Sequence, residues 1–270
     1  MLFKNILLAV DVDGTLYNDD CEIPQRNITA IKEFCENGGL FTLATGRATS
    51  YARYIASQLD ISIPCVVYNG SMVYDYKNEK IIWQKVMPGS VIDSMKDFQG
   101  KFPTIGIEIM QGEDIYVIST NFQTEAHITS IHVPVIRCSL DEAPSSDLDK
   151  ILIVDEEDAI DELFAYAVKL GLDDTHVTRS SPFYLEMLPP STNKSEGLKE
   201  LIKICNLDNH YLVTAGDFIN DLEMLKMSDL PVAVGNALDI VKEHADLVVC
   251  DNNSGAIYEV IEYLKVKNNI

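Results

Sequence analysis

The sequence has few positive charges and no apolar run long enough to cross a membrane. Lys and Arg number 21 against 42 Asp and Glu, which gives a formal net charge of −21 at pH 7. Nucleic acids and anionic lipid surfaces are bound through Lys/Arg patches, and a spanning helix needs about 20 apolar residues. The composition therefore argues against nucleic-acid and membrane partners. Small phosphorylated molecules remain open, because salt damps fields beyond about 8 Å and a locally cationic pocket can hold an anion.

The sequence also lacks any closely spaced cysteine pair. Its six cysteines stand at positions 21, 35, 65, 138, 205 and 250, without CxxC or zinc-type spacing. A chain of this size does not need disulfides to fold, so we expect reduced thiols. The apolar run Ile6–Val10 is too short for a signal peptide. These features predict a cytoplasmic protein, and they give no prediction of its oligomeric state.

Apolar segments alternate with amphipathic ones at both ends of the chain. Segments 6–10, 40–44 and 65–68 are apolar runs, typical of strands covered on both faces, with helical segments between them. The alternation returns after Ser191, with strands predicted at 211–215, 232–234 and 247–250. Strand and helix alternating at this spacing indicate an α/β fold with a parallel sheet and right-handed crossovers.

The middle of the chain follows another pattern. Segments 105–109 and 115–118 flank the turn residues 111–114, which predicts an antiparallel hairpin. A strand at 151–154, a helix that Gly171 ends and a strand at 184–188 follow. We therefore predict a discontinuous α/β core, 1–82 and 186–270, interrupted by an α+β insert, 83–185.

Four polar clusters lie next to the ends of predicted strands, where open parallel sheets bind ligands. They are Asp11-Val-Asp13-Gly-Thr15, Thr45-Gly46-Arg47, Ser191-Thr-Asn-Lys194 and Gly216-Asp217-Phe-Ile-Asn220-Asp221. Asp11 and Asp13 alone fit a turn, and Asp217 and Asp221 alone fit a helix cap equally well. Together they place four repelling carboxylates at one sheet edge. A hard dication relieves that repulsion, and Mg²⁺ is usual where a phosphate completes its ligand shell.

Lys194 and Thr45 are weaker signals by themselves. A hydroxyl at a strand-to-helix junction, such as that of Thr45, is commonly an N-cap. Lys194 stands near a predicted helix start, where the macrodipole disfavours a cation. A cation at that place suits an anionic ligand, which favours a functional reading of Lys194.

In this order the clusters resemble the four motifs of the haloacid dehalogenase superfamily, and the insert resembles the type IIB cap of its Cof-like phosphatases. The resemblance covers essentially the whole chain. The segments that carry it are DVDGTL at 11–16, GDFINDLEM at 216–224, TGR at 45–47, YNGS at 68–71 and AVGNA at 233–237. It implies a Rossmann-like core with an inserted α+β cap. It also implies a Mg²⁺-dependent phosphatase acting on small phosphorylated metabolites, with sugar phosphates as the first expectation and pyridoxal phosphate or a flavin mononucleotide as alternatives.

The resemblance implies a role for each motif residue. Asp11 would attack phosphorus to form an aspartyl-phosphate, while Asp13 would protonate the leaving alcohol and then activate water. Magnesium would be bound by Asp11, the backbone carbonyl of Asp13 and Asp217, with Asp221 supporting these ligands. The expected phosphate-binding groups are Thr45, Gly46, Lys194, Asn220 and the backbone N–H of Val12. Arg47 and Asn69 are candidates for substrate contact, although Arg47 is equally able to pair with an acid.

Two features qualify the match. Ser195 follows Lys194 where the family often has glycine, which predicts a small adjustment of the lysine loop. Substrate choice is expected to depend on the insert, but its polar candidates read first as solvated positions: Glu108, Glu113, Tyr116 and His127. Trp83 is expected to pack rather than to stack on a sugar.

Three other functions fit parts of the pattern. A phosphomutase of the same superfamily would return the phosphoryl group to its substrate. A non-catalytic binding protein on the same scaffold has no need to keep Asp11, Asp13, Lys194 and Asp217 together. A receiver-like domain phosphorylated on aspartate must retain its phosphoryl group, which an acid/base residue such as Asp13 opposes.

Overall fold

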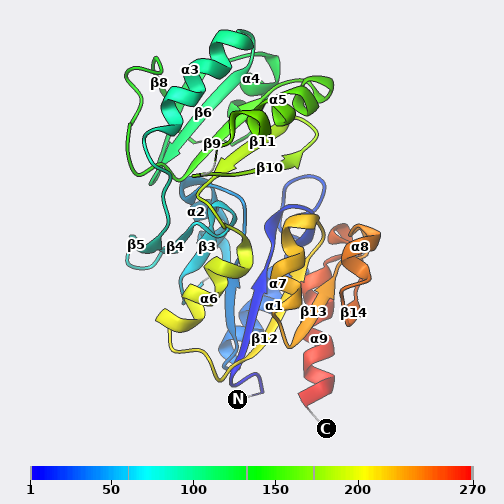
Figure 1. The fold of residues 1–270 in the computed structure, drawn as a ribbon. Helices are drawn as coiled ribbons and strands as arrows, with labels where there is room; N and C mark the ends of the chain where they lie inside the picture. Colours follow the sequence, from blue (N-terminus) through cyan, green and yellow to red (C-terminus); the bar gives the residue numbers. More distant parts are fainter. Residues whose placement is uncertain (1, 60, 132, 173, 269–270) are drawn as a thin grey trace. The chain divides into compact units, whose positions relative to one another are not determined.

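The structure is a computed structural model that describes residues 2–59, 61–131, 133–172 and 174–268. The chain divides into two compact units, and Figure 1 labels many of its helices and strands. The core unit comprises Met1–Arg47, Ala52–Trp83 and Asn193–Ile270, and the cap unit comprises Ala48–Tyr51 and Gln84–Thr192. No helix in the described ranges combines the length and apolar character needed to span a bilayer.

A five-stranded parallel sheet forms the centre of the core unit. Its strand order is β14-β13-β12-β1-β2. The strands are β1 (Ile6–Val10), β2 (Leu40–Leu43), β12 (Tyr211–Gly216), β13 (Leu230–Ala233) and β14 (Leu247–Val248). Every residue of β1 is buried, as its continuous apolar run predicts for a strand covered on both faces. The predicted α/β class with a parallel sheet is confirmed.

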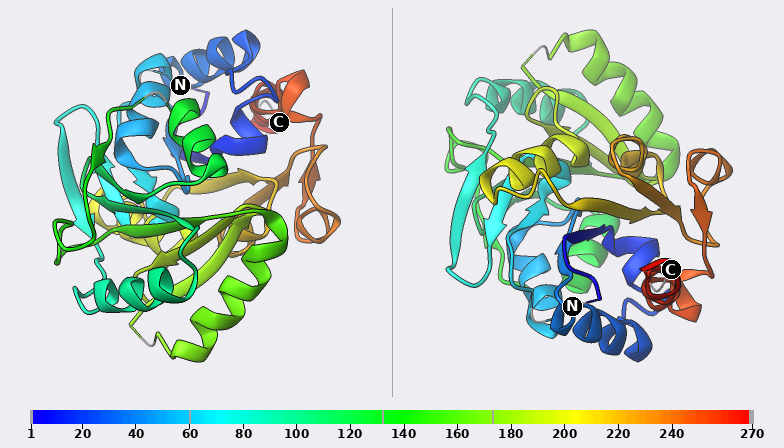
Figure 2. Two further views of the ribbon diagram at one scale, coloured as in Figure 1. Left: turned by 90° about the horizontal axis from the view of Figure 1, so that it is seen from above. Right: turned by 90° about the horizontal axis from the view of Figure 1, so that it is seen from below.

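Helices cover both faces of this sheet. Helices α1 (Gln25–Glu36) and α9 (Ala256–Asn268) pack against each other on one face. Helices α6 (Lys194–Ile204) and α7 (Leu222–Lys226) lie on the other, as the view from below in Figure 2 shows. The core unit also contains α8 (Asp239–Lys242) and most of α2 (Thr49–Leu59). The amphipathic pattern of the helices places their apolar stripes on the sheet.

Beyond β2 the parallel sheet gives way to a three-stranded sheet, β3-β4-β5. It consists of β3 (Cys65–Val67), β4 (Met72–Asp75) and β5 (Lys80–Gln84). The prediction of a third parallel strand is only partly right, because β3 pairs antiparallel with β4. Strand β3 is joined to the end of β2 by an isolated parallel bridge between Ala44 and Val66. The antiparallel hairpin at 72–84 was not predicted, since its apolar pattern is short.

The cap unit contains a six-stranded sheet with the order β10-β11-β9-β6-β7-β8. Its strands are β6 (Gly106–Gln111), β7 (Asp114–Ser119), β8 (Ile136–Arg137), β9 (Lys150–Val154), β10 (His176–Ser181) and β11 (Tyr184–Leu188). Strands β6 and β7 form the predicted hairpin. Side chains of α3 (Val91–Lys101) and α5 (Glu157–Leu170) join alternate residues of β6, β9 and β11 in one apolar cluster. Helix α4 (Phe122–Ile131) completes the unit.

Candidate active site

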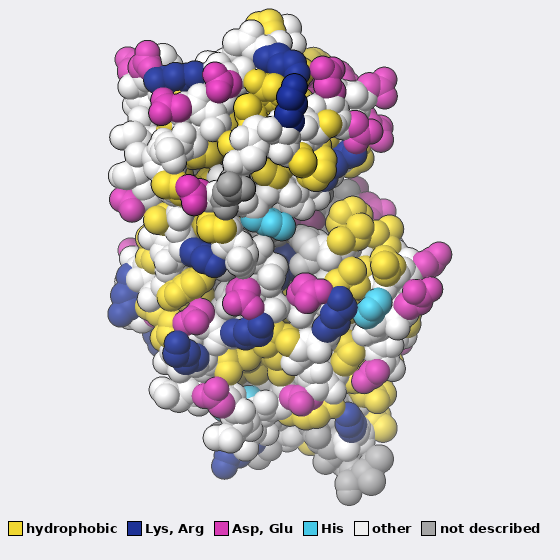
Figure 3. Space-filling model, viewed as in Figure 1, with side chains coloured by type: hydrophobic (Ala, Val, Ile, Leu, Met, Phe, Trp, Pro, Cys, Tyr) yellow, Lys and Arg dark blue, Asp and Glu magenta, His cyan; other side chains and the backbone are white. Residues whose placement is uncertain are grey.

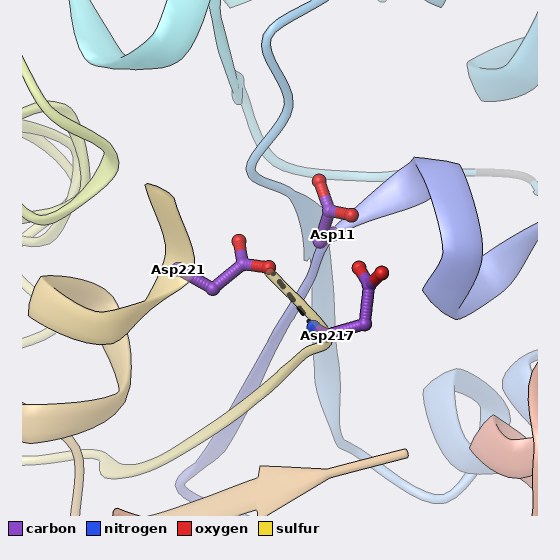
Figure 4. Close-up of side chains that lie close together, drawn as sticks. All are labelled: Asp11, Asp217 and Asp221. Carbon is purple, nitrogen blue, oxygen red and sulfur yellow. Dashed lines mark hydrogen bonds between the residues drawn. The ribbon is translucent and has the colours of Figure 1, made fainter. Parts of the chain in front are cut away.

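Three carboxylates meet at the carboxyl ends of two adjacent core strands (Figure 4). Asp11 directly follows β1, Asp217 directly follows β12, and Asp221 ends the short helix Ile219–Asp221. One carboxylate oxygen of each residue lies within 4.8 Å of the other two. Because β1 and β12 are parallel neighbours, the motif residues that follow them converge at one sheet edge.

Lys194 joins these acids. It is the first residue of α6, whose cap is the Asn193 side chain accepting the Glu196 N–H at 3.0 Å. The fully buried Lys194 Nζ donates to Asp11 and also to Asp221 Oδ1 at 2.6 Å. Ser195 is buried next to it and does not displace the lysine from the acids. Lys194 lies at the helix end where the macrodipole disfavours a cation, so its ion pairs with the two acids hold it there.

The electrostatics of the cluster favour an additional cation. Burial raises the pKa of Asp11 well above its ordinary value; Lys194 opposes this, and the other carboxylates add to it. Burial, and then Asp221, raise the pKa of Asp217 to about 6. Burial alone would favour the neutral amine of Lys194, but Asp11 and Asp221 outweigh it and raise the Lys194 pKa. One lysine thus faces three acids whose charges remain in excess.

The ways in which the acids are bonded distinguish their roles. Asp221 Oδ2 accepts the N–H groups of Asp217 at 3.0 Å and Phe218 at 3.1 Å, while its Oδ1 accepts from Lys194. Asp221 therefore orients the loop and the lysine. Asp11 and Asp217 supply carboxylate oxygens, the donor type that a hard dication prefers. The residues present fit a divalent cation held by Asp11 and Asp217 and supported by Asp221.

An irregular turn, Val12–Leu16, carries Asp13 and Gly14. Gly14 has φ +75°, and a Cβ there would lie 2.5 Å from Asp217 Oδ2, so the turn can approach Asp217 only with glycine. The Thr15 hydroxyl donates to Asp217 Oδ1 at 3.1 Å. The Asn236 amide donates to the Gly14 carbonyl at 2.8 Å.

Thr15 and Asn236 hold the turn through hydrogen bonds, although the sequence predicted no role for them. Both lie inside segments that carry the resemblance, DVDGTL and AVGNA. Both residues are polar, and a polar residue inside such a segment is the signal that could have identified them.

The second motif contacts the first through Arg47. Its guanidinium pairs with the Asp13 carboxylate, with Nε 2.7 Å from Oδ2. The Arg47 backbone N–H donates to Thr45 Oγ1 at 3.1 Å. Of the two readings that the sequence leaves open for Arg47, pairing with an acid is the one seen in the structure.

Asn69 and Asn220 also meet at this site. The Asn220 amide donates to Asn69 Oδ1 at 3.2 Å, and the Asn69 N–H donates to the Thr45 carbonyl at 3.0 Å. A Cβ on Gly46 would lie 2.8 Å from Asn69 Oδ1. The structure therefore brings together the predicted phosphate-binding residues Thr45, Gly46 and Asn220 with the substrate candidate Asn69.

The chain reaches Asn69 through a strained segment. Tyr68 has φ +51° and Asn69 has φ +53°, and the tyrosine is fully buried. A positive φ is a genuine outlier for a bulky residue and costs on the order of 1–3 kcal/mol, which surrounding contacts must offset. Glycine at position 70, with φ +101°, allows close approach, because a Cβ there would meet the Asn193 carbonyl at 1.9 Å.

The polar candidates in the insert have different environments. Glu108 is fully buried on the central strand β6, with one oxygen 2.8 Å from His127 Nδ1, so the expectation that it is solvated is wrong. Glu108 points to the face of β6 opposite the apolar cluster, and α4 packs on that face with His127 against this carboxylate, so solvent does not reach it. Glu113 is exposed, Tyr116 packs partly against the cap cluster, and Trp83 packs against the core cluster as expected.

The sequence and the fold are similar to those of known proteins. Residues 8–261 match the haloacid dehalogenase-like hydrolase family. A 5-amino-6-(5-phospho-D-ribitylamino)uracil phosphatase of Bacillus subtilis is 27% identical over 262 residues, covering 95% of this chain and 94% of that protein.

Two solved structures have the same fold. A haloacid dehalogenase-like hydrolase from Bacteroides thetaiotaomicron aligns with a TM-score of 0.89 at 24% identity, covering 97% of this chain and 100% of that one. A subclass IIB sugar phosphatase of the superfamily aligns with a TM-score of 0.83 at 21% identity, covering 97% and 99%. The resemblance inferred from the motifs is confirmed. The chain is a phosphatase, and it belongs to the haloacid dehalogenase-like hydrolase family.

Proposed function

We propose that the protein is a Mg²⁺-dependent phosphomonoesterase that hydrolyses small phosphorylated metabolites through an aspartyl-phosphate on Asp11. The observation that carries this proposal is the position of Asp11. Its carboxylate is buried at the end of β1, paired with Lys194 and next to Asp217 and Asp221. Asp13 follows two residues later on the same turn.

The proposed reaction has two steps, and both use Asp11 and Asp13. In the first, an Asp11 oxygen bonds to phosphorus, the bond from phosphorus to the leaving oxygen breaks, and Asp13 donates a proton to that oxygen. In the second, water bonds to phosphorus, the Asp11–phosphorus bond breaks, and Asp13 accepts the water proton. Uncatalysed phosphate-monoester hydrolysis is so slow that enhancements up to about 10²¹-fold are known, so positioning and charge neutralisation must contribute most.

Other residues would hold the phosphoryl group. The proposed donors are Thr45, the N–H groups of Gly46 and Val12, Lys194 and Asn220. Bound Mg²⁺ would neutralise phosphoryl charge, held by Asp11, the Asp13 carbonyl and Asp217 and supported by Asp221. The excess of acid over base in this cluster supports the Mg²⁺ assignment, because an added cation relieves the repulsion between the carboxylates.

We further propose a sugar or polyol phosphate as substrate, selected by residues of the insert. Support comes from the Bacillus subtilis relatives, which are named for a phosphate ester of a ribityl chain. Small phosphorylated metabolites are intracellular molecules, so this substrate class also supports a cytoplasmic location.

Asp11→Asn tests the proposal. The variant should lose turnover of p-nitrophenyl phosphate while its circular dichroism and melting temperature show an intact fold. Asp20→Asn, which removes an exposed carboxylate from the same stretch of chain, is the matched control and should keep wild-type turnover. Near-normal activity of Asp11→Asn would end the nucleophile assignment. Free phosphate formed from a sugar phosphate without a matching isomer would exclude a mutase as the main activity.

A further inference from the structure

Arg47 and Asp13 form a two-point contact. Arg47 Nε donates to Asp13 Oδ2 at 2.7 Å, and Nη2 donates to Oδ1. A planar guanidinium that binds both oxygens of a carboxylate fixes the orientation of that carboxylate as well as its position. The Asp13 side chain is 58% exposed, whereas that of Arg47 is 14% exposed. The exposed Asp13 carboxylate is thus oriented by the largely buried Arg47 guanidinium.

Stability does not explain this pair. Ion pairs with an exposed partner contribute little to stability, because water screens them and side-chain entropy opposes them. An exposed aspartate without such a partner samples several staggered rotamers. The effect of Arg47 on Asp13 is therefore mainly to select one orientation of its carboxylate.

Arg47 is itself held in place. Its guanidinium carbon lies 5.1 Å from the centre of the Tyr17 ring, and Tyr17 directly follows the turn that carries Asp13. The Arg47 carbonyl accepts the Tyr68 N–H at 3.0 Å, and its N–H is bonded to Thr45. Contacts from two motifs thus set the direction in which Arg47 presents its guanidinium.

We propose that Arg47 is a positioning residue for Asp13, and that it acts on the reaction through this carboxylate. The inference rests on the proposed function, since it takes Asp13 as the acid that protonates the leaving oxygen and the base that deprotonates water. An Asp13 carboxylate that rotates freely would spend much of its time out of reach of either oxygen, and proton transfer depends on that reach.

The leaving group separates this role from others. An alkoxide is strongly basic and leaves only with a proton from Asp13, whereas nitrophenolate is stable and leaves without one. In single-turnover experiments, Arg47→Met should slow the first step with glycerol 2-phosphate by about 10²-fold, within the usual range for general acid catalysis. The release of the first nitrophenolate from p-nitrophenyl phosphate should change less than about threefold. KM for the aryl substrate should stay near its wild-type value.

A double-mutant cycle tests whether Arg47 acts through Asp13. In an Asp13→Ala background, Arg47→Met should cause no further loss with glycerol 2-phosphate. Arg47→Lys keeps the charge but not the two-point contact, so it should lose alkyl turnover and still fold. Arg53→Met is the matched control, because Arg53 also pairs with a carboxylate, Glu79 at 2.9 Å, and lies over tyrosine rings. It should keep the wild-type ratio of alkyl to aryl rates.

Three results would overturn the inference: equal losses for both leaving groups, additive losses in the Asp13→Ala background, or a raised KM with unchanged kcat. The last would indicate that Arg47 binds the substrate directly. A wild-type protein that releases no nitrophenolate would instead contradict the proposed function, so the two failures are distinguishable.

Discussion

At the scale of single residues, Gly14 shows how closely the turn Val12–Leu16 is packed. Its φ of +75° suits glycine, and a side chain there would lie 2.5 Å from Asp217 Oδ2. Gly14 also lies between Asp13 and Thr15, and the Thr15 hydroxyl is hydrogen-bonded to Asp217. Any movement of Gly14 therefore changes the spacing between the proposed acid and the proposed metal ligand.

Gly14→Ala should reduce turnover by at least tenfold and raise the Mg²⁺ concentration needed for half-maximal activity. Its free energy of unfolding should fall by about 1–2 kcal/mol, because alanine is strained at positive φ. Gly171→Ala is the control: Gly171 has φ +61° at the end of α5, and no atom of the described residues lies within 4 Å of its would-be Cβ. It should show a similar loss of stability by urea unfolding with unchanged turnover. Wild-type metal dependence in Gly14→Ala would contradict the account.

The convergence of the charged residues was predictable, but their orientation was not. Aspartates follow apolar strands, and the strands alternate with helices as in a parallel sheet. This pattern predicts that Asp11, Asp217 and Asp221 meet at one edge of the sheet. The pairing of Asp13 with Arg47 depends on the irregular turn and on the positive φ of Tyr68, which ordinary sequence patterns do not encode. The sequence pattern therefore does not decide between substrate contact and acid pairing for Arg47.

At the scale of elements, Asp149 joins three segments of the cap unit just before β9. Its carboxylate accepts the Gln84 amide at 2.7 Å and the Gly112 N–H at 2.6 Å. Burial raises the pKa of Asp149 to about 6, and these two hydrogen bonds act in the opposite direction. The β6–β7 turn and the end of β5 are thus connected through a group that titrates in an accessible range.

Asp149→Asn should alter the pH dependence of stability. In the unfolded chain the carboxyl titrates near its ordinary 3.8, and in the folded chain near about 6. Between these values only the folded state retains the proton, so wild-type stability relative to the asparagine variant should fall as pH rises through this window and then level off. The total change should be at most about 3 kcal/mol, measured by urea unfolding of both proteins between pH 4 and pH 7.5. A stability difference that does not vary with pH would contradict the assignment.

The elements that were predicted and those that were missed differ in their patterns. Strands β1, β12 and β9 consist mostly of apolar residues, and their burial agrees with that composition. Strand β3 looks equally apolar, but its antiparallel partner β4 depends on the reversal at Tyr68 and Asn69. Glu108 was misjudged because a charge on a central strand gives no local sign that a histidine from α4 covers it.

At the scale of the whole molecule, the net charge of −21 coexists with a proposed anionic substrate. Figure 3 shows acidic and basic side chains interspersed on the face that it draws. Fields from exposed charges are damped within about 8 Å at physiological salt. The buried charges of Lys194, its acidic partners and the proposed Mg²⁺ are screened much less, so the balance among them decides binding.

Mg²⁺ should stabilise the whole protein if Asp11 and Asp217 bind it. A ligand that binds only the folded state adds about 2.7 kcal/mol at a concentration of 100 Kd, so the melting temperature should rise with Mg²⁺ and fall again with EDTA. Asp217→Asn should lose this response, whereas the control Asp20→Asn should retain it. A melting temperature indifferent to Mg²⁺ in the wild type would contradict the proposed metal site, whatever the activity.

The most direct test of the central claim is the covalent state of Asp11 during turnover. Asp13→Ala should accumulate the intermediate, because the variant lacks the base that activates water. After mixing with p-nitrophenyl phosphate, acid quenching and borohydride reduction, an aspartyl-phosphate is converted to homoserine, which mass spectrometry locates in the chain. The account predicts homoserine at position 11. An unmodified Asp11 in a sample that has released a stoichiometric burst of nitrophenolate would contradict it.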